Sequence, residues 1–203
     1  MSVRFKMPLS FENTVAALTA AIQAEVEFRH RTFIMNDEVQ TEITKLARWL
    51  TGGGSQFGVM LCGTCGNGKS TMMKAFQQLL CGMRIPNPYP QDSCYPWYGL
   101  HIVDAKHIAH LCKTNYAAFL NLAKEDMLGI DDIGTEPIEV LDYGNPLNPV
   151  IDLLTKRYEC QLFTFATSNL LPEEIRERYG VRIADRLNEM MFKIGFDNPT
   201  FRL

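Results

Sequence analysis

A glycine-rich stretch at residues 63–71 carries the strongest chemical signal in the chain. Gly63 is followed, after four residues, by Gly68-Lys69-Ser70, which is the spacing of a phosphate-binding loop. Glycine allows the left-handed backbone angles with which such a loop turns its N–H groups toward an anion. Lys69 would reach the β and γ phosphates of a nucleotide, and the Ser70 hydroxyl would ligate Mg²⁺. The residues expected to bind ATP are Gly63, Thr64, Cys65, Gly66, Asn67, Gly68, Lys69, Ser70 and Thr71.

A pair of acids forms the second chemical landmark. Asp131 and Asp132 end an apolar run that begins after Asp126. In a parallel sheet, ligands bind beyond the carboxyl ends of the strands. We therefore expect Asp131 to hold Mg²⁺ through water and Asp132 to orient and activate an attacking water. An Asp-Asp turn alone is common, but downstream of a phosphate-binding loop it predicts a site that hydrolyses nucleotide.

The elements that must position these residues alternate between strand and helix. Runs of β-forming residues predict strands at 57–62, 100–103, 126–133, 161–167 and 191–196. Helical patterns and start signals predict helices at 11–30 and 36–50, from about 69, and at 104–112, 115–123, 148–159, 172–180 and 181–187. Asn13 or Thr14 could cap the first helix, and Asn36 the second. This alternation is typical of an α/β domain with a parallel sheet.

Length and composition exclude several classes of protein. With 203 residues, 46% of them hydrophobic, the chain fits one globular domain. A net charge of −3 argues against a protein coated in basic surface, although a local basic strip for nucleic acid remains open. No stretch approaches the length of a membrane helix, and no signal peptide is visible. The six cysteines form no compact secreted framework. These features favour a cytoplasmic protein with reduced thiols and no membrane partner.

Two short patterns of cysteine and histidine also suggest chemistry. Cys62 and Cys65 have the spacing of a redox pair or half a zinc site, but they lie inside the phosphate loop, and no second pair completes a metal cage. Coincidence is the favoured interpretation; the alternative hypothesis is that oxidation of this pair blocks nucleotide binding. His107 and His110 stand three residues apart, with His101 and Cys112 close by. Without a matching pair elsewhere, we favour a structural role for them.

Two segments could serve as contact surfaces. Residues 82–99 hold four prolines, which exclude a helix or central strand there, together with Tyr89, Tyr95, Trp97 and Tyr98. This loop is either a contact surface or an insertion packed by its own aromatic rings. The predicted helix at 11–30 has an apolar stripe formed by Val15, Leu18, Ile22 and Val26. This stripe either packs on the core or docks a partner, and packing is the favoured alternative.

The order of these landmarks resembles the AAA+ ATPases of the DnaC/IstB type, which are bacterial helicase loaders and ATPase helpers of transposable elements. The matching pieces are residues 63–70 (Walker A), 130–134 (Walker B), 166–169 (sensor 1) and 178–186 (the arginine-finger region). The resemblance covers about residues 36–203. It implies a P-loop NTPase three-layer sandwich with a parallel five-stranded sheet, ordered 5-1-4-3-2 along the chain's own strand numbering. Residues 1–35 would form an N-terminal helical arm and residues 36–203 the AAA+ ATPase core.

The resemblance also implies roles for single residues. Asn169 would position the water or the γ-phosphate, and Arg186 would be the finger that completes a neighbouring subunit's site, with Arg182 as the nearby alternative. Other copies of the chain are therefore expected partners. Single-stranded DNA is another, because the helix pair at 105–123 could offer it a cation and stacking rings. Lys113 would be the cation, and Tyr116 and Phe119 would be the stacking rings. The alternative for the two rings is that they pack in the core.

The chain also departs from the fuller members of that class. Little room follows the last strand for a helical lid, no sensor 2 arginine can be assigned, and Asp132 stands where the class often has Glu. The implied function is ATP hydrolysis with Lys69, Asp132, Asn169 and Arg186 as catalytic residues, acting on a replicative helicase, transposase or conjugation protein. The alternatives are an ATP-dependent switch or scaffold with little turnover, and a P-loop small-molecule kinase.

Overall fold

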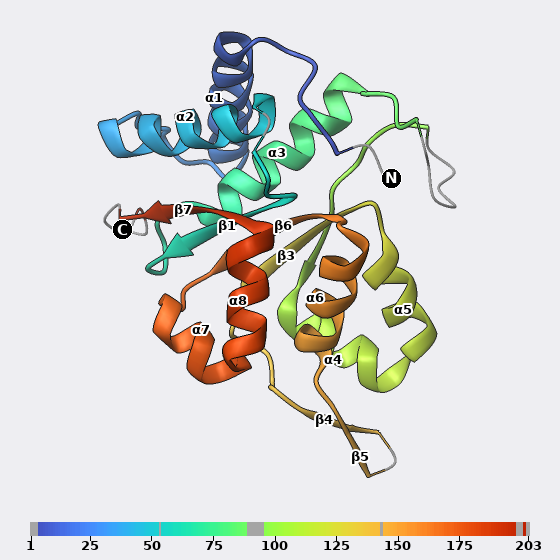
Figure 1. The fold of residues 1–203 in the computed structure, drawn as a ribbon. Helices are drawn as coiled ribbons and strands as arrows, with labels where there is room; N and C mark the ends of the chain where they lie inside the picture. Colours follow the sequence, from blue (N-terminus) through green and yellow to red (C-terminus); the bar gives the residue numbers. More distant parts are fainter. Residues whose placement is uncertain (1–3, 53, 89–95, 143, 198–200, 202–203) are drawn as a thin grey trace.

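A computed structural model of the chain describes residues 4–52, 54–88, 96–142, 144–197 and 201. Helices cover both faces of one sheet, so the molecule has three layers (Figure 1). The helices are α1 (Phe11–Phe28), α2 (Asp37–Thr51), α3 (Lys69–Met83), α4 (Ala105–Thr114), α5 (Tyr116–Lys124), α6 (Pro149–Cys160), α7 (Pro172–Tyr179) and α8 (Val181–Met190). The strands are β1 (Gly58–Gly63), β2 (His101–Asp104), β3 (Met127–Ile133), β4 (Val140–Asp142), β5 (Asn145–Leu147), β6 (Phe163–Ser168) and β7 (Met191–Phe196).

The main sheet has the predicted strand order. Its five strands run β2-β3-β6-β1-β7, and every neighbouring pair is parallel. The antiparallel pair β4–β5 forms a separate hairpin. The main-sheet strands in chain order are therefore β1, β2, β3, β6 and β7, which correspond to predicted strands 1 to 5. Read from the other edge, the order is 5-1-4-3-2, which confirms the expected three-layer sandwich. The carboxyl ends of β1, β3 and β6 therefore meet at one edge of the sheet.

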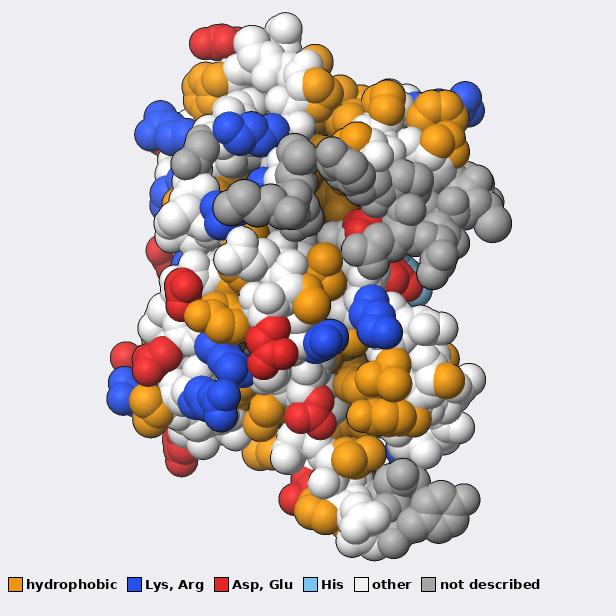
Figure 2. Space-filling model, turned by 45° about the vertical axis from the view of Figure 1, so that its right-hand side comes forward, with side chains coloured by type: hydrophobic (Ala, Val, Ile, Leu, Met, Phe, Trp, Pro, Cys, Tyr) orange, Lys and Arg blue, Asp and Glu red, His pale blue; other side chains and the backbone are white. Residues whose placement is uncertain are grey.

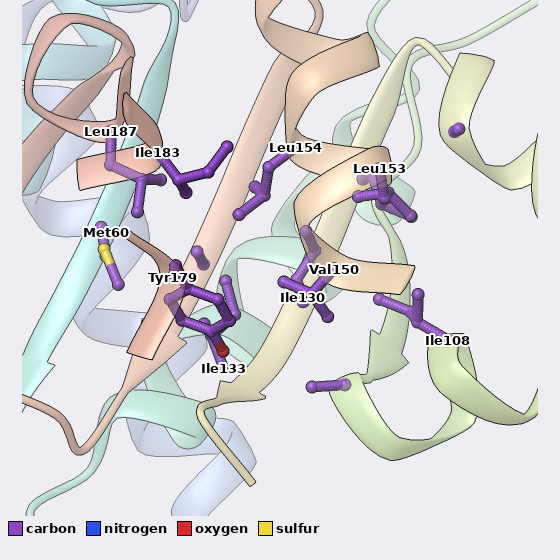
Figure 3. Close-up of a cluster of buried hydrophobic side chains, with 14 of the residues drawn as sticks. Met60, Ile108, Ile130, Ile133, Val150, Leu153, Leu154, Tyr179, Ile183 and Leu187 are labelled. Atoms are coloured by element: carbon purple, nitrogen blue, oxygen red, sulfur yellow. The ribbon is translucent and has the colours of Figure 1, made fainter. Parts of the chain in front are cut away.

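The two cores lie on opposite faces of the sheet because alternate residues of a strand point to opposite sides. In β1, Val59 and Leu61 pack with α1, α2 and α3. Met60 belongs instead to the cluster under α4 to α8, part of which is seen in Figure 3, where Ile130, Leu153 and Ile183 are other labelled members. All six residues of β6 are buried, as expected for a central strand with helices on both sides.

The N-terminal helix α1 packs on the core. Leu18 and Ile22 are buried in the same cluster as α3, as the packing alternative expects. The cap is Ser10, whose hydroxyl accepts a hydrogen bond from the Asn13 N–H at 3.2 Å. Neither Asn13 nor Thr14 caps the helix, so that expectation was wrong. Asn36 caps α2 as predicted. The boundary between an arm at 1–35 and a core from residue 36 stays a prediction.

The hairpin β4–β5 was not predicted from the sequence, and the proline-rich segment is described only in part. The hairpin β4–β5 extends away from the sheet (Figure 1) and had no predicted counterpart. In the proline-rich segment, α3 continues to Met83, and Pro86 pairs with Trp97 through an isolated bridge. Residues 89–95, with Tyr89 and Tyr95, lie outside the described residues, so the role of that loop stays open. No helix in the described parts of the chain is long and apolar enough to cross a membrane.

Arg157 is a fully buried cation that joins α6 to the sheet. Its guanidinium donates to the Glu125 carbonyl at 2.8 Å, to the Thr164 hydroxyl at 2.9 Å and to the Phe163 carbonyl. Burial lowers the pKa of Arg157 to about 9, an effect that the Glu125 and Asp126 carboxylates oppose. This residue therefore satisfies polar groups at the amino-terminal ends of β3 and β6.

We expect Arg157→Ala to lower the free energy of unfolding by about 3 to 5 kcal/mol, because it leaves buried carbonyls without donors and opens a cavity. Urea denaturation of the two proteins measures the difference. Arg176→Ala is the matched control, since Arg176 is exposed on α7 and should change stability by less than about 0.5 kcal/mol. A loss below about 1 kcal/mol for Arg157→Ala would show that these bonds do not hold the layer together.

Candidate functional site

The loop between β1 and α3 has the backbone that its glycines predict. Gly63, Gly66 and Gly68 all have positive φ, at 150°, 88° and 99°. Gly63 also has no room for a side chain, since an added Cβ would lie 2.2 Å from the Phe196 carbonyl oxygen. The loop is tied to β7 by the Asn67 amide, which donates to that carbonyl at 2.7 Å. Glycine is thus required at residue 63 both by conformation and by space.

Lys69 opens α3 and turns back over the loop. Its ammonium donates to the Gly63 and Thr64 carbonyls at 2.9 and 2.7 Å and to the Asn67 side-chain oxygen at 3.0 Å. The side chain is 5% exposed. Burial lowers the pKa of Lys69, while nearby Asp132 is the largest opposing influence. The cation is therefore held inside the cradle where a phosphate chain would lie.

One hydroxyl, that of Thr167 at the end of β6, organises both acids of β3. It donates to the Asp131 carboxylate at 2.6 Å and accepts from the Asp132 N–H at 2.8 Å. The same Asp131 oxygen accepts a hydrogen bond from the Ser70 hydroxyl at 2.8 Å. A hydroxyl and a carboxylate at this spacing are oxygen donors of the kind that Mg²⁺ prefers. Ser70 and Asp131 therefore fit the predicted metal site.

Asp132 stands in a strained position at the end of β3. Its φ is +57°, a left-handed conformation that costs a residue other than glycine roughly 1 kcal/mol or more. The pairing of β3 with β6 shifts register between Ile130 and Ile133, so the two acids leave the regular ladder. The Asn169 amide lies 3.5 Å from the Asp132 carboxylate. Strain of this kind gathers at functional sites, and here it presents a carboxylate toward the loop.

We expect Thr167→Val to leave the affinity for ATP within about threefold and to lower the rate of hydrolysis about 10- to 100-fold. The fold and the loop survive, but neither acid is then held in place, and small displacements of catalytic groups are costly. Steady-state phosphate release with a parallel measurement of ATP affinity tests this. Thr167→Ser keeps the hydroxyl and should retain most of the activity. Equal activity of the Val and Ser variants would contradict the role of this hydroxyl.

Glu136 links the loop after β3 to helix α7, a connection that no sequence signal indicated. Its buried carboxylate accepts from the Gly134 N–H at 2.8 Å and from the Tyr179 hydroxyl, and lies 3.7 Å from the Arg178 guanidinium. Burial and the bond to Glu136 raise the pKa of Tyr179 above its ordinary value. The loop that carries the two acids is thus fixed to the element that precedes α8.

A pocket of about 590 Å³ surrounds the loop. One side is formed by the loop, Asp132 and Asn169, and the other by the end of α1 and the connection to α2. The predicted binding residues that line it are Cys65, Gly66, Asn67, Gly68, Lys69, Ser70 and Thr71. Lys69, Ser70, Asp132 and Asn169 all line this pocket, and Asp131 adjoins it through its hydrogen bond with Ser70, so the structure brings these predicted residues together.

The two candidate finger residues lie apart from this pocket, on α8. Arg186 donates to the Thr155 hydroxyl at 2.9 Å and stacks over the Tyr158 ring, with its side chain 15% exposed. Arg182, one helical turn earlier, is exposed. Neither is among the residues that line the pocket. The geometry therefore does not favour a catalytic role for Arg182 or Arg186 in the pocket of their own chain.

The remaining candidates divide between surface and core. Phe119 is 2% exposed and belongs to the core, so it cannot be a stacking surface; Tyr116 lies against it and is 49% exposed. Cys62 is a half-buried free thiol at the end of β1, and Cys65 lines the pocket. His107 and His110 stack on each other at the surface. Among the described residues, no group of three or more His, Cys, Asp and Glu side chains could hold a metal.

Taken together, a phosphate-binding loop between β1 and α3, two acids at the end of β3 and a polar residue after β6, on a sheet of this order, define a P-loop-like α/β fold with three layers. The same fold occurs in solved structures of replication proteins. DnaI has a TM-score of 0.63 at 19% identity, over 90% of this chain and 93% of that one. For the DnaC helicase loader the values are 0.59 and 16%, over 81% and 93%.

Two further structures show the same likeness. A putative primosome component from Streptococcus pyogenes serotype M3 has a TM-score of 0.60 at 17% identity, over 90% of this chain and 98% of that one. DnaA from Aquifex aeolicus, bound to AMPPCP, has a TM-score of 0.53 at 18% identity, over 83% and 50%. The sequence matches no protein-family model, and no curated protein matches it. At these identities the likeness establishes the fold.

Proposed function

We propose that this protein binds ATP with Mg²⁺ and hydrolyses it as a helicase-loader-type ATPase in DNA replication or in the transfer of a mobile element. The observation that carries the proposal is the chain of contacts from Ser70 through Asp131 to Thr167, which joins the phosphate loop to the ends of β3 and β6. A metal bound there would neutralise charge on the phosphates, while Asp132 would orient the attacking water.

The proposed partners follow from the fold and from one surface. A replicative helicase is the first client to test, because DnaC in the comparison is a helicase loader; a transposase or conjugation protein is the alternative. Single-stranded DNA is supported by a DnaA structure that contains it. In the view of Figure 2, hydrophobic side chains gather near lysines and arginines at lower right. Tyr116 at the start of α5 and Lys113 in α4 are both exposed and could supply a stacking ring and a cation to single-stranded DNA.

The test measures phosphate release with and without Mg²⁺, single-stranded DNA and a purified replicative helicase. We expect Mg²⁺-dependent hydrolysis that rises when DNA or the helicase is added. Tight ATP binding with no release under any of these conditions would instead support the switch or scaffold, which Asp132 in place of Glu mildly favours. Transfer of phosphate to an added small acceptor, in preference to water, would support the kinase.

A further inference from the structure

Part of the pocket lining comes from the end of α1 and the connection to α2, and it carries positive charge. Arg29, the C-cap of α1, and Arg31, in the connection to α2, both line the pocket with Lys69. Thr32 and Phe33 continue this wall. A polyanion held in the phosphate loop would therefore meet cations from two separate parts of the chain. Of these two arginines, Arg29 has a contact with Thr71, which follows the loop.

The end of α1 is fixed by a two-bond helix stop. The His30 N–H donates to the Glu27 carbonyl at 2.8 Å, and the Arg31 N–H donates to the Val26 carbonyl at 3.3 Å, which is the Schellman pattern. His30 takes the left-handed conformation at φ 57° that this stop requires. Glycine usually occupies that position, so the backbone here is held against a conformational cost of roughly 1 kcal/mol or more. The stop therefore fixes the backbone next to Arg29, whose side chain contacts Thr71 in the first turn of α3.

The contacts of Arg29 point it at the phosphate loop. Its guanidinium lies 3.4 Å from the Thr71 hydroxyl, in the first turn of α3, and donates to the Glu25 carboxylate at 3.0 Å. The preceding hydroxyl, that of Ser70, is bonded to Asp131. Consecutive residues of a helix point about 100° apart. The first turn of α3 therefore has the metal-binding acid on one side and a guanidinium on another.

We propose that Arg29 binds the phosphate chain of the nucleotide in this loop, on the side away from Asp131. The proposal rests on the proposed function, since it assigns a further residue to the same ATP site. The side chain is 36% exposed, so it can turn from Thr71 to a phosphate oxygen without unpacking α1. A guanidinium donates two parallel hydrogen bonds to phosphate, which suits it to this role. Docking of α1 on α3 would then be coupled to nucleotide occupancy.

The experiment compares the dissociation constants of ATP, ADP and adenosine for Arg29→Ala, Glu25→Ala and Arg48→Ala in the full chain. Arg48 is the matched control, since it stacks over Phe11 between α2 and α1 and does not line the pocket. We expect Arg29→Ala to weaken ATP and ADP alike by about 10-fold and to leave adenosine unchanged. Arg48→Ala should change none of the three. Glu25→Ala should leave ATP binding unchanged or tighten it, because Arg29 loses its competing carboxylate.

Two results would overturn the inference while the proposed function stands. An equal loss of ATP affinity in Glu25→Ala and Arg29→Ala would show that their ion pair only anchors the end of α1. An equal loss of adenosine and ATP affinity in Arg29→Ala would place its effect away from the phosphates. Failure of the unaltered protein to bind ATP would refute the proposed function itself. Melting temperatures of all three variants, measured without nucleotide, separate a general loss of fold from a loss of binding.

Discussion

Lys69→Ala is expected to weaken ATP binding on the order of 100-fold and to abolish hydrolysis, because it removes the cation that would face the β and γ phosphates. In the structure, that cation donates to two loop carbonyls and to the Asn67 amide oxygen. A phosphate chain would offer it charged oxygens instead of neutral ones, which adds attraction between opposite charges to hydrogen bonds whose donor is already charged. Binding of a fluorescent ATP analogue, together with phosphate release, measures both effects.

The control for this variant is Lys74→Ala, which removes a lysine from the exposed side of the same helix. It should retain full binding and activity. Since Lys69 also closes its own loop, a melting curve must show that Lys69→Ala remains folded. Ser70→Ala provides an independent test, because it should remove the dependence of binding on Mg²⁺ while leaving the lysine in place. Retention of ATP affinity in Lys69→Ala would remove the basis for reading this loop as a nucleotide site.

The residues that could be assigned from sequence are those whose chemistry is local. The spacing of Gly63, Lys69 and Ser70 fixes the loop by itself, because the glycines, the lysine and the helix start all lie within eight residues. Asp131 and Asp132 could be placed because an apolar run ends at them, and parallel strands bring their carboxyl ends to one edge. The order of the five main strands followed from the resemblance to a class of proteins rather than from any pattern in the strands.

The parts that sequence could not supply depend on contacts between distant segments. In the sequence, Thr167 has the pattern of an ordinary strand residue. Its role follows only from the register shift in β3, where the Asp132 N–H donates to its hydroxyl. Arg157 reads as a surface cation on an amphipathic helix, yet it is fully buried. The hairpin β4–β5 has strands of three residues and Pro146 within one of them, which removes the usual strand signal. For Arg186, spacing could not show that Thr155 lies within hydrogen-bond distance on another helix.

The second large effect expected is a loss of ATP hydrolysis when an arginine of α8 is replaced. A finger must leave its own chain and reach the γ-phosphate of a neighbour. Arg186, which the resemblance favours for this role, is held by Thr155, Tyr158 and Glu159 and would have to release all three. Arg182 is exposed in the first turn of α8. Within the part of the chain that the structure describes, no hydrogen bond or ion pair is seen for its side chain. The geometry thus favours Arg182, and the two residues are best tested as a pair.

We expect Arg182→Ala to lower hydrolysis in the assembled state by 10³-fold or more, with the affinity for ATP unchanged, because a finger acts on charge that develops in the transition state. Arg186→Ala should lower the free energy of unfolding by about 1 kcal/mol through its lost contacts with α6, with a smaller loss of activity. Sedimentation in the presence of ATP must first show that both variants assemble. A 10³-fold loss in Arg186→Ala, with Arg182→Ala active, would return the role to Arg186.

Mixing two inactive variants separates a finger in trans from a residue that acts within its own chain. Arg182→Ala protein keeps an intact Asp132, and Asp132→Asn protein keeps an intact Arg182, so a mixed assembly contains interfaces where both are present. Such interfaces should restore a substantial fraction of the activity if α8 of one chain completes the site of the next. A residue needed only by its own active site gives no recovery at any mixing ratio. Because recovery requires a subunit interface, the same experiment decides whether the site built around Lys69 and Asp131 is shared between two copies of the chain.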